Sequence, residues 1–161
     1  MIIVRRAGSL DARPMAELLN AIIRKGGTTA FTEQVSAQTL QGWITKAPDR
    51  SAWHLAEDET GTVMGFQSIE PKEKLGPDAC DIATFVRIGH TGMGIGSRLF
   101  EKTTQAARAF GYEWINATIR ADNESGLTYY QSRGFEQYAR HKNVALANGQ
   151  IVDRISKRYD L

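Results

Sequence analysis

A glycine-rich stretch in the second half of the chain constrains the fold more than any other segment. Glycine stands at every second position of Gly92-Met93-Gly94-Ile95-Gly96, after an apolar strand-like run (82–86) and before a helical pattern. Glycine lets backbone N–H groups turn inward, and the first turn of a helix has unpaired N–H groups and the positive end of the dipole. The stretch therefore predicts a cradle for a phosphate or pyrophosphate. The alternative is a turn without a ligand.

The spacing of these glycines argues against two other phosphate loops. A P-loop requires Lys-Ser or Lys-Thr after its last glycine, but Ile95 follows Gly94, which stands at the right distance from Gly89. A dinucleotide fingerprint requires a further glycine where Ser97 stands, and it follows the first strand of its unit rather than lying mid-chain.

Composition narrows the class of protein. The length of 161 residues suits one domain, expected over 1–161. The net charge of +2, without basic runs interleaved with aromatics, predicts no nucleic-acid partner. No apolar run approaches the ~20 residues of a membrane span, and no signal peptide is expected. The single Cys80 fits a reducing, cytoplasmic compartment, and the three His and one Cys lack the spacing of metal ligands.

Hydrophobic periodicity predicts the order of the elements. The predicted strands cover residues 2–6, 53–56, 63–69, 82–86, 114–119, 138–145 and 151–159. The predicted helices run from capping residues Ser9 and Asp11 to Gly26, from about 36 to 46, from the glycine stretch to about 110, and from Asn123 to Gly134. This order predicts an α/β (mixed α+β) fold with helices on both faces of a mixed sheet of six to seven strands.

Two separated motifs resemble the GNAT superfamily of N-acetyltransferases. One is the glycine stretch, and the other is Asn123-Glu-Ser125 followed by Tyr130-Gln-Ser-Arg-Gly134-Phe135. The resemblance implies a GNAT-type sheet that splays between strands four and five, with acetyl-CoA as cosubstrate. Looser likenesses, such as Asn20 and the 28–31 loop, point to the branch that acetylates phosphinothricin, methionine sulfoximine and related L-amino acids. That branch is typically homodimeric.

The resemblance also implies which residues hold coenzyme A. Backbone groups of Phe85, Val86 and Arg87 would pair with the pantetheine arm, and Asn123 and Ser125 would hydrogen-bond it, unless they are simply helix caps. The pyrophosphate would lie on the loop and first helical turn formed by Thr91, Gly92, Met93, Gly94, Ile95, Gly96 and Ser97. Thr91 stands where the family usually has Arg or Gln, so one phosphate contact is weakened. His90 or Arg98 would compensate for this contact.

Acetyl transfer to an amine requires a polarised carbonyl, a neutral amine and a protonated leaving thiolate. Tyr130 matches the family position that protonates the thiolate; the alternative is a core tyrosine. Asp81 is the first candidate for the general base, with Glu70 and His90 as runners-up. Its alternative is an exposed carboxylate at the start of the fourth strand. His54 and His141 are expected on strand surfaces, and Cys80 is expected to be buried.

The acceptor side of the site is less well defined by the sequence. Thr28, Thr29 and Phe31 are candidates to line its pocket. The branch's arginine after the third strand has no clear counterpart, since Glu73 stands near its place. The leading expectation is direct acetyl transfer, in a ternary complex, to a small-molecule amine such as an amino acid. The alternatives are acetylation of a protein N-terminus or lysine, and a non-catalytic acyl-CoA-binding module.

Overall fold

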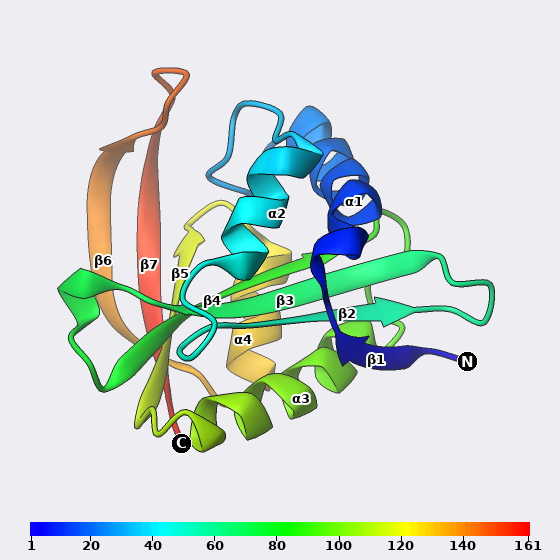
Figure 1. Cartoon of the computed structure of the whole chain (residues 1–161). Helices are drawn as coiled ribbons and strands as arrows, with labels where there is room; N and C mark the ends of the chain where they lie inside the picture. The colour runs from blue at the N-terminus through cyan, green and yellow to red at the C-terminus, as the bar shows by residue number, and fades with distance from the viewer.

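A single seven-stranded sheet forms the centre of the computed structural model, which describes residues 1–161 (Figure 1). Its spatial order is β1-β2-β3-β4-β5-β7-β6, and only β4 and β5 pair in parallel. The strands are β1 (Ile3–Arg6), β2 (Ala52–Glu57), β3 (Val63–Pro71), β4 (Ala79–Val86), β5 (Trp114–Arg120), β6 (Glu136–Ala145) and β7 (Ile151–Asp160). The predicted mixed α/β fold is confirmed.

Four helices cover the two faces of this sheet. They are α1 (Ala12–Lys25), α2 (Ala37–Thr45), α3 (Ile95–Ala109) and α4 (Glu124–Ser132), and two short 3₁₀ turns span Ser9–Asp11 and Glu73–Leu75. In Figure 1, α1 and α2 lie above the sheet and α3 runs beneath it. No helix is long and apolar enough to cross a membrane.

Separate apolar clusters fill the two sides of the sheet. The apolar stripe of α1, at i, i+3, i+4, i+7 and i+8, packs with α2 against β2 and β3; the members include Met15, Leu19, Leu40, Leu55 and Phe66. On the other face, α3 and α4 pack against β4 and β5; the members include Ile82, Phe100, Ile115, Tyr130 and Phe135. Each helix pair therefore has its own core, with the sheet between them.

Two local expectations differ from the structure. β4 begins at Ala79 rather than residue 82, because Ala79, Cys80 and Asp81 pair with β5 on one side while β3 continues on the other. Asp81 thus lies inside the strand rather than at its start. His54 is buried, with 7% of its surface exposed, whereas a strand-surface position was expected. Its side chain is covered because α3 packs on β2.

The sheet opens between its two parallel strands. β4 and β5 keep a common register only over Ala79↔Trp114, Cys80↔Ile115 and Asp81↔Asn116. Beyond that point, β4 stays paired with β3 as far as Val86, while β5 stays paired with β7 as far as Arg120. The diverging strands leave a wedge-shaped gap, so the predicted splay between the fourth and fifth strands is present.

Candidate active site

A cavity of about 1030 Å³ occupies the gap between β4 and β5. Its walls come from the open half of β4, the end of β5, the glycine stretch, α4 and the loop after α1. The pairing of β4 with β5 ends here, so the gap connects the two sides of the sheet. The cavity consequently has one part beside α3 and α4 and another beside the loop of residues 28–31.

The glycine stretch has the backbone of an anion cradle. Gly92 and Gly94 have φ values of +83° and +78°, a left-handed conformation that favours glycine. The first helical hydrogen bond of α3 runs from Arg98 N to Gly94 O, so the N–H groups of the preceding turn have no helical acceptor. The stretch lines the cavity through Thr91, Gly92, Gly94, Ile95, Gly96 and Ser97. Met93, 59% exposed, is outside the lining.

Gly96 has a different role from the other two glycines. A Cβ built on Gly96 would stand 2.6 Å from Cε1 of Tyr129, while Gly92 and Gly94 have open space around theirs. The Tyr129 hydroxyl donates to the Gly96 carbonyl oxygen at 2.7 Å. The third glycine of the stretch is therefore needed for the close packing of α4 on α3.

The ladder between β3 and β4 determines which backbone groups face the gap. In an antiparallel pair, residues bond to the partner strand at alternate positions. Arg87 N donates to Met64 O at 2.8 Å, so the groups of Arg87 and Phe85 point towards β3. The N–H and C=O of Val86 and Thr84 consequently point into the gap. Of the three predicted pantetheine partners, only Val86 has its backbone aimed there.

Arg87 departs from its predicted place in a second way. Its guanidinium donates to the carbonyl oxygen of Val63 through Nε at 2.9 Å and Nη2 at 2.5 Å, and Arg87 does not line the cavity. Its function in the fold is to fix the end of β4 to β3.

Tyr130 lies on the α4 side of the gap. It is 6% exposed, and its hydroxyl is 2.8 Å from Oγ1 of Thr84. Burial raises the pKa of Tyr130 far above its usual value, and the hydrogen bond with Thr84 acts in the opposite direction. The raised pKa keeps the phenol neutral at physiological pH, and Tyr130 is one of the residues that line the cavity.

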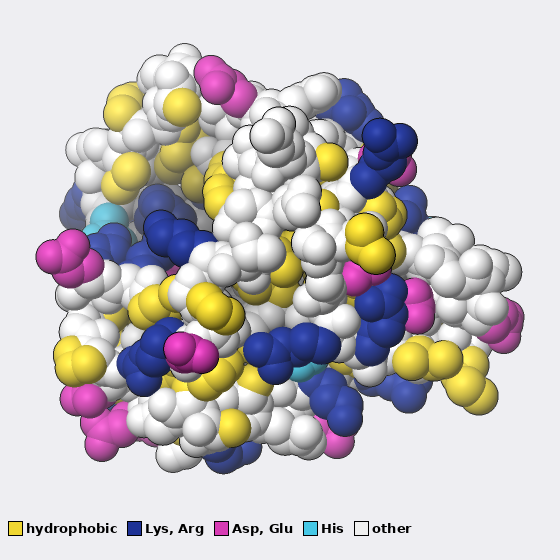
Figure 2. Space-filling model, viewed as in Figure 1, with side chains coloured by type: hydrophobic (Ala, Val, Ile, Leu, Met, Phe, Trp, Pro, Cys, Tyr) yellow, Lys and Arg dark blue, Asp and Glu magenta, His cyan; other side chains and the backbone are white.

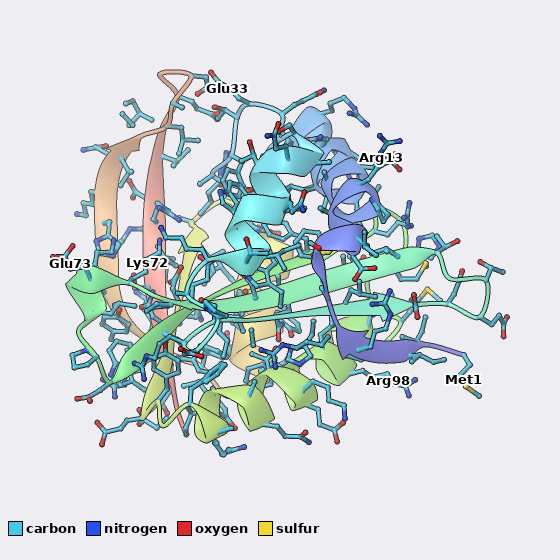
Figure 3. The ribbon with its side chains drawn as sticks, in the orientation of Figure 1. Met1, Arg13, Glu33, Lys72, Glu73 and Arg98 are labelled. Carbon is cyan, nitrogen blue, oxygen red and sulfur yellow. The ribbon has the colours of Figure 1, made fainter.

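A second set of side chains lines the opposite side of the sheet. Side chains alternate along a strand, and Phe85 packs against the α1–α2 core, so Asp81 also faces that side. Asp81 Oδ1 accepts from Asn116 Nδ2 at 2.8 Å, and Oδ2 lies 3.5 Å from Lys72 Nζ. The carboxylate is thus held by one neutral donor and one exposed cation. Figure 3 shows Lys72 at the left of the view, just beyond the end of β3, and Arg98 at the lower right.

Arg154 of β7 contributes a positive charge to the same side of the gap. Its cross-strand partner is Arg120, and both residues line the cavity. Arg154 Nε is buried without a hydrogen-bond partner, and Nη2 reaches Thr118 O only at 3.5 Å. Burial lowers the pKa of Arg154, and the charge of Asp81 acts against that shift. Figure 2 shows Lys and Arg side chains in the hollow between the β6–β7 hairpin and the α1–α2 layer.

The loop after α1 covers this charged part of the cavity. Arg120, 4% exposed, forms a bidentate pair with Asp122 and donates to the Thr29 carbonyl oxygen at 3.2 Å. Phe31 stacks on Trp43, with ring centroids 5.6 Å apart. Thr28, Thr29 and Phe31 all line the cavity, as the predicted acceptor pocket requires.

Asn123 and Ser125 are tied up at the start of α4. Asn123 Oδ1 accepts from Gly126 N and Ser125 Oγ, both at 3.1 Å, and Asn123 Nδ2 donates to Thr28 O at 3.0 Å. Asn123 is therefore the N-cap of α4 and also a link to the acceptor loop. Both residues line the cavity.

The remaining candidates are placed unequally. His90 lines the cavity beside the glycine stretch, far along β4 from Asp81, whereas Arg98 does not line it. Glu70 lies outside the lining, and burial followed by the charge of Asp81 raises its pKa. Burial raises the pKa of Cys80 to about 12, so this thiol is a core group. No group of three or more His, Cys, Asp and Glu side chains gathers as metal ligands.

Thr84, Gln67 and Arg154 are functional candidates that the sequence motifs did not reveal. Each lies on a β-strand, and none belongs to a recognisable sequence motif. The one signal that Thr84 and Gln67 offered in the sequence is a polar residue within a largely apolar strand. The structure shows that Gln67 is fully buried in β3. Arg154 offered none, because charged residues are common throughout β7.

Known proteins provide independent evidence on the family. The model of the acetyltransferase (GNAT) family matches residues 15–135. The chain is 26% identical over 156 residues to the L-methionine sulfoximine/L-methionine sulfone acetyltransferase of Pseudomonas aeruginosa, covering 93% of this chain and 89% of that protein. It is 24% identical over 152 residues to the L-amino acid N-acyltransferase MnaT of Escherichia coli, covering 93% and 88%.

Solved structures share the fold over nearly the whole chain. A phosphinothricin acetyltransferase from Sinorhizobium meliloti, in complex with acetyl-CoA, superposes with a TM-score of 0.85 at 19% identity and covers 99% of this chain and 88% of that one. A ribosomal-protein-alanine N-acetyltransferase from Brucella melitensis gives 0.87 at 23% identity, covering 99% of each.

The chain belongs to the acetyltransferase (GNAT) family. It is an N-acetyltransferase, and its acetyl donor is acetyl-CoA, as predicted. The residues present suit that donor: the unpaired edge of β4 offers main-chain groups to an extended amide arm, and the left-handed glycines expose N–H groups to a pyrophosphate.

Proposed function

We propose that this enzyme transfers the acetyl group to the α-amine of a small amino acid or amino-acid analogue, by direct transfer in a ternary complex. The observation that carries the proposal is the half-buried Arg154 guanidinium, which stands in the acceptor part of the cavity with an unpartnered Nε. A guanidinium is well suited to bind a carboxylate through two parallel hydrogen bonds. The acceptor would therefore carry a carboxylate or phosphinate beside its amine.

Arg154 would take the place of the arginine after the third strand that the amino-acid-acetylating branch implies. In this chain that region provides Lys72, whose ammonium is held 3.5 Å from Asp81. The relatives named for L-amino acids and L-methionine sulfoximine support the same class of acceptor. Thr28, Thr29 and Phe31 would enclose the side chain of the acceptor.

Asp81 is proposed as the base that removes a proton from the amine, directly or through one water. An α-amine with a pKa near 8 costs only about 1 kcal/mol to deprotonate at pH 7, whereas a lysine-type amine costs about 4–5 kcal/mol. Asp81 is paired with an ammonium 3.5 Å from one oxygen. An amine that loses its proton easily therefore suits this carboxylate better than a strongly basic amine does. An amino acid is thus a better match than a lysine side chain.

The backbone and Tyr130 complete the proposed mechanism. Acetyl-CoA supplies an activated thioester, whose C–S bond breaks as the new N–C bond forms. A main-chain N–H of β4 that is aimed into the gap, that of Thr84 or Val86, would stabilise the oxygen that becomes negative. Tyr130 would give its hydroxyl proton to the departing sulfur and later regain one from water. The glycine stretch, with Thr91 and Ser97, would hold the pyrophosphate.

A single assay tests this proposed function. Thiol release from acetyl-CoA is measured with L-amino acids, the amines that lack their carboxylate, methionine sulfoximine, phosphinothricin, and peptides with free N-termini or lysines. We expect the highest kcat/KM with one of the compounds that has an amine and an acidic group on the same carbon. Preferential turnover of a peptide would contradict the proposal and favour a protein acceptor.

The family resemblance also leads us to propose a cytoplasmic homodimer. Light scattering of the purified protein checks the second part of this proposal. A dimer has twice the 17.9 kDa of one chain. A mass of 17.9 kDa at assay concentration would contradict it.

A further inference from the structure

A chain of hydrogen bonds crosses the buried side of the gap and ends at Tyr130. It joins the Gly96 carbonyl, the Tyr129 hydroxyl, the Gln67 amide, the Thr84 hydroxyl and the Tyr130 hydroxyl. These groups come from α3, α4, β3 and β4, and Gln67 and Tyr129 are 62 residues apart in the sequence. All the links lie between 2.7 and 3.0 Å.

The direction of the first two links follows from the chemistry of the groups. A carbonyl oxygen can only accept, so the Tyr129 hydroxyl donates its single proton to Gly96 O. The Tyr129 oxygen can then only accept from Gln67, which fixes the Gln67 NH₂ group towards it. The orientation of the amide is thereby determined by the backbone of the glycine stretch.

The direction of the third link follows in turn, whereas the fourth link can run either way. The second N–H of the Gln67 amide donates to Thr84 Oγ1 at 2.9 Å. Thr84 still has its own hydroxyl proton, and its one remaining partner is the Tyr130 oxygen at 2.8 Å. If Thr84 donates there, the proton of Tyr130 is free to point into the cavity. If Tyr130 donated to Thr84 instead, no proton would be presented to a leaving sulfur.

We infer that Thr84 and Gln67 are positioning residues that turn the hydroxyl proton of Tyr130 towards the leaving sulfur and stabilise the phenolate as that proton departs. The inference rests on the proposed acid role of Tyr130. No proton moves along the chain of hydrogen bonds. The Tyr130 O–H bond breaks, the proton joins the sulfur, and the negative oxygen keeps the hydrogen bond from Thr84.

The burial of the network explains why such support is needed. Tyr130 is 6% exposed and Gln67 has no exposed surface, so water cannot stabilise a negative phenolate oxygen on that side. The charged groups that face the network are few: Arg133 acts on Tyr129, and Asp81 acts on Tyr130 through the gap in a direction that opposes ionisation. The Gln67 Oε1 atom is left without a partner, which is the cost of directing both N–H groups into the chain.

The experiment compares Thr84→Val with Thr84→Ser, since valine keeps the shape of threonine and serine keeps its hydroxyl. We expect Thr84→Val to lower kcat about 10-fold, the effect of one hydrogen bond to a developing charge, and Thr84→Ser to restore most of it. The dissociation constant of coenzyme A should stay within about 2-fold for both. An unchanged or higher kcat in Thr84→Val would overturn the inference, because it would mean that Tyr130 had been donating to Thr84.

A second readout is independent of turnover. In protein labelled with carbon-13 at tyrosine Cζ, Tyr130→Phe identifies the Tyr130 resonance in the free enzyme. Thr84→Val should move this resonance, and Thr84→Ser should leave it near the wild-type position. A resonance unmoved by Thr84→Val would overturn the hydrogen bond itself. Absence of wild-type turnover with every acceptor would contradict the proposed function instead, so the two failures are distinguishable.

Gln67→Leu tests the other end of the chain. It should lower kcat by less than Thr84→Val, because Thr84 keeps its proton but loses the donor that fixes its orientation. The unfolding midpoint is measured alongside, and Gln67→Leu in a normally stable protein with wild-type kcat would remove Gln67 from the positioning role.

Discussion

At the end of the cavity beside α3, backbone groups present the binding surface, whereas charged side chains define the end beneath the Thr28–Phe31 loop. The first end consists of left-handed glycines, the start of α3 and the unpaired edge of β4. The second brings Lys72, Asp81 and Arg154 together from three strands or their ends. A surface built of backbone groups is kept when most side chains change, whereas a surface built of side chains changes with each substitution.

This difference determines what could be predicted from the sequence. Glycine spacing and a following helix are local signals, so Gly92, Gly94 and Gly96 could be assigned to the cofactor end without a structure. The acceptor end depends on contacts between segments distant in the sequence, such as Arg120 of β5 with the loop residue Thr29, which are 91 residues apart. Arg154 could not be found in that way, and Asp81 could be named only through the family resemblance.

Two details of the cofactor end could not be predicted from the motif, and both have a physical cause. Arg87 was grouped with Val86 because they are neighbours in the sequence, but the alternation of the ladder turns their backbones in opposite directions. Gly96 lines the cavity, and its close contact with Tyr129 adds a packing requirement that the motif did not reveal. Neither the register nor the packing of α4 is visible in a motif.

The largest effect on kcat should come from Tyr130, which lies between the two ends of the cavity. Tyr130→Phe removes the hydroxyl that would protonate the sulfur and leaves the packing of the ring intact. We expect kcat to fall on the order of 10²-fold, while the dissociation constant of coenzyme A is unchanged. Steady-state kinetics and calorimetry measure the two values. An unaltered kcat would remove Tyr130 from the acid role.

A change at Gly96 should weaken cofactor binding and leave acceptor binding intact. Gly96→Ala places a Cβ 2.6 Å from Tyr129 Cε1, so the ring must move and its hydrogen bond to Gly96 O is lost. We expect coenzyme A to bind about 10-fold more weakly by calorimetry, because the displaced ring disturbs the N–H groups of the first turn of α3 by roughly the equivalent of one hydrogen bond to a charged group.

Gly42→Ala is the matched control for this substitution. Gly42 lies within α2, and a Cβ there meets nothing within 4 Å. Alanine should stabilise the helix by about 0.5–1 kcal/mol and leave coenzyme A affinity unchanged. Equal affinities in Gly96→Ala and Gly42→Ala would show that the contact between Tyr129 and α3 has no influence on the cofactor end.

A change at Arg154 should damage the acceptor end selectively. Arg154→Leu removes the guanidinium proposed to bind the acceptor's acidic group, and we expect the KM of an amino acid to rise about 10-fold. The KM of the corresponding amine without a carboxylate should not change. Arg140→Leu is the control, since Arg140 lies on the neighbouring β6, pairs with Asp153 and does not line the cavity. A similar rise for both acceptors would exclude carboxylate recognition by Arg154.

The smallest effect on function is expected for His54, a buried residue outside the cavity. A change there should alter the stability of the fold and not cofactor binding. Burial, followed by the charges of Arg6 and Lys102, lowers the pKa of His54 to about 4. Between that value and the ordinary pKa near 6.5, the unfolded chain binds a proton that the folded chain does not. The free energy of unfolding should therefore fall as pH decreases from about 6.5 to 4.

Urea unfolding across this pH range measures the effect, with His54→Gln as the comparison. The substitution should flatten the slope between about pH 6.5 and 4 without changing coenzyme A affinity at pH 7.5. The same slope in wild type and His54→Gln would assign the pH dependence to other groups.

The separation of the two ends is tested most directly by calorimetric titration of coenzyme A into wild type, Gly96→Ala and Arg154→Leu. A backbone-built cofactor end predicts that Arg154→Leu binds coenzyme A as wild type does, within about 2-fold, while Gly96→Ala binds it about 10-fold more weakly. The reverse pattern, with affinity lost in Arg154→Leu and retained in Gly96→Ala, would contradict the assignment of both ends.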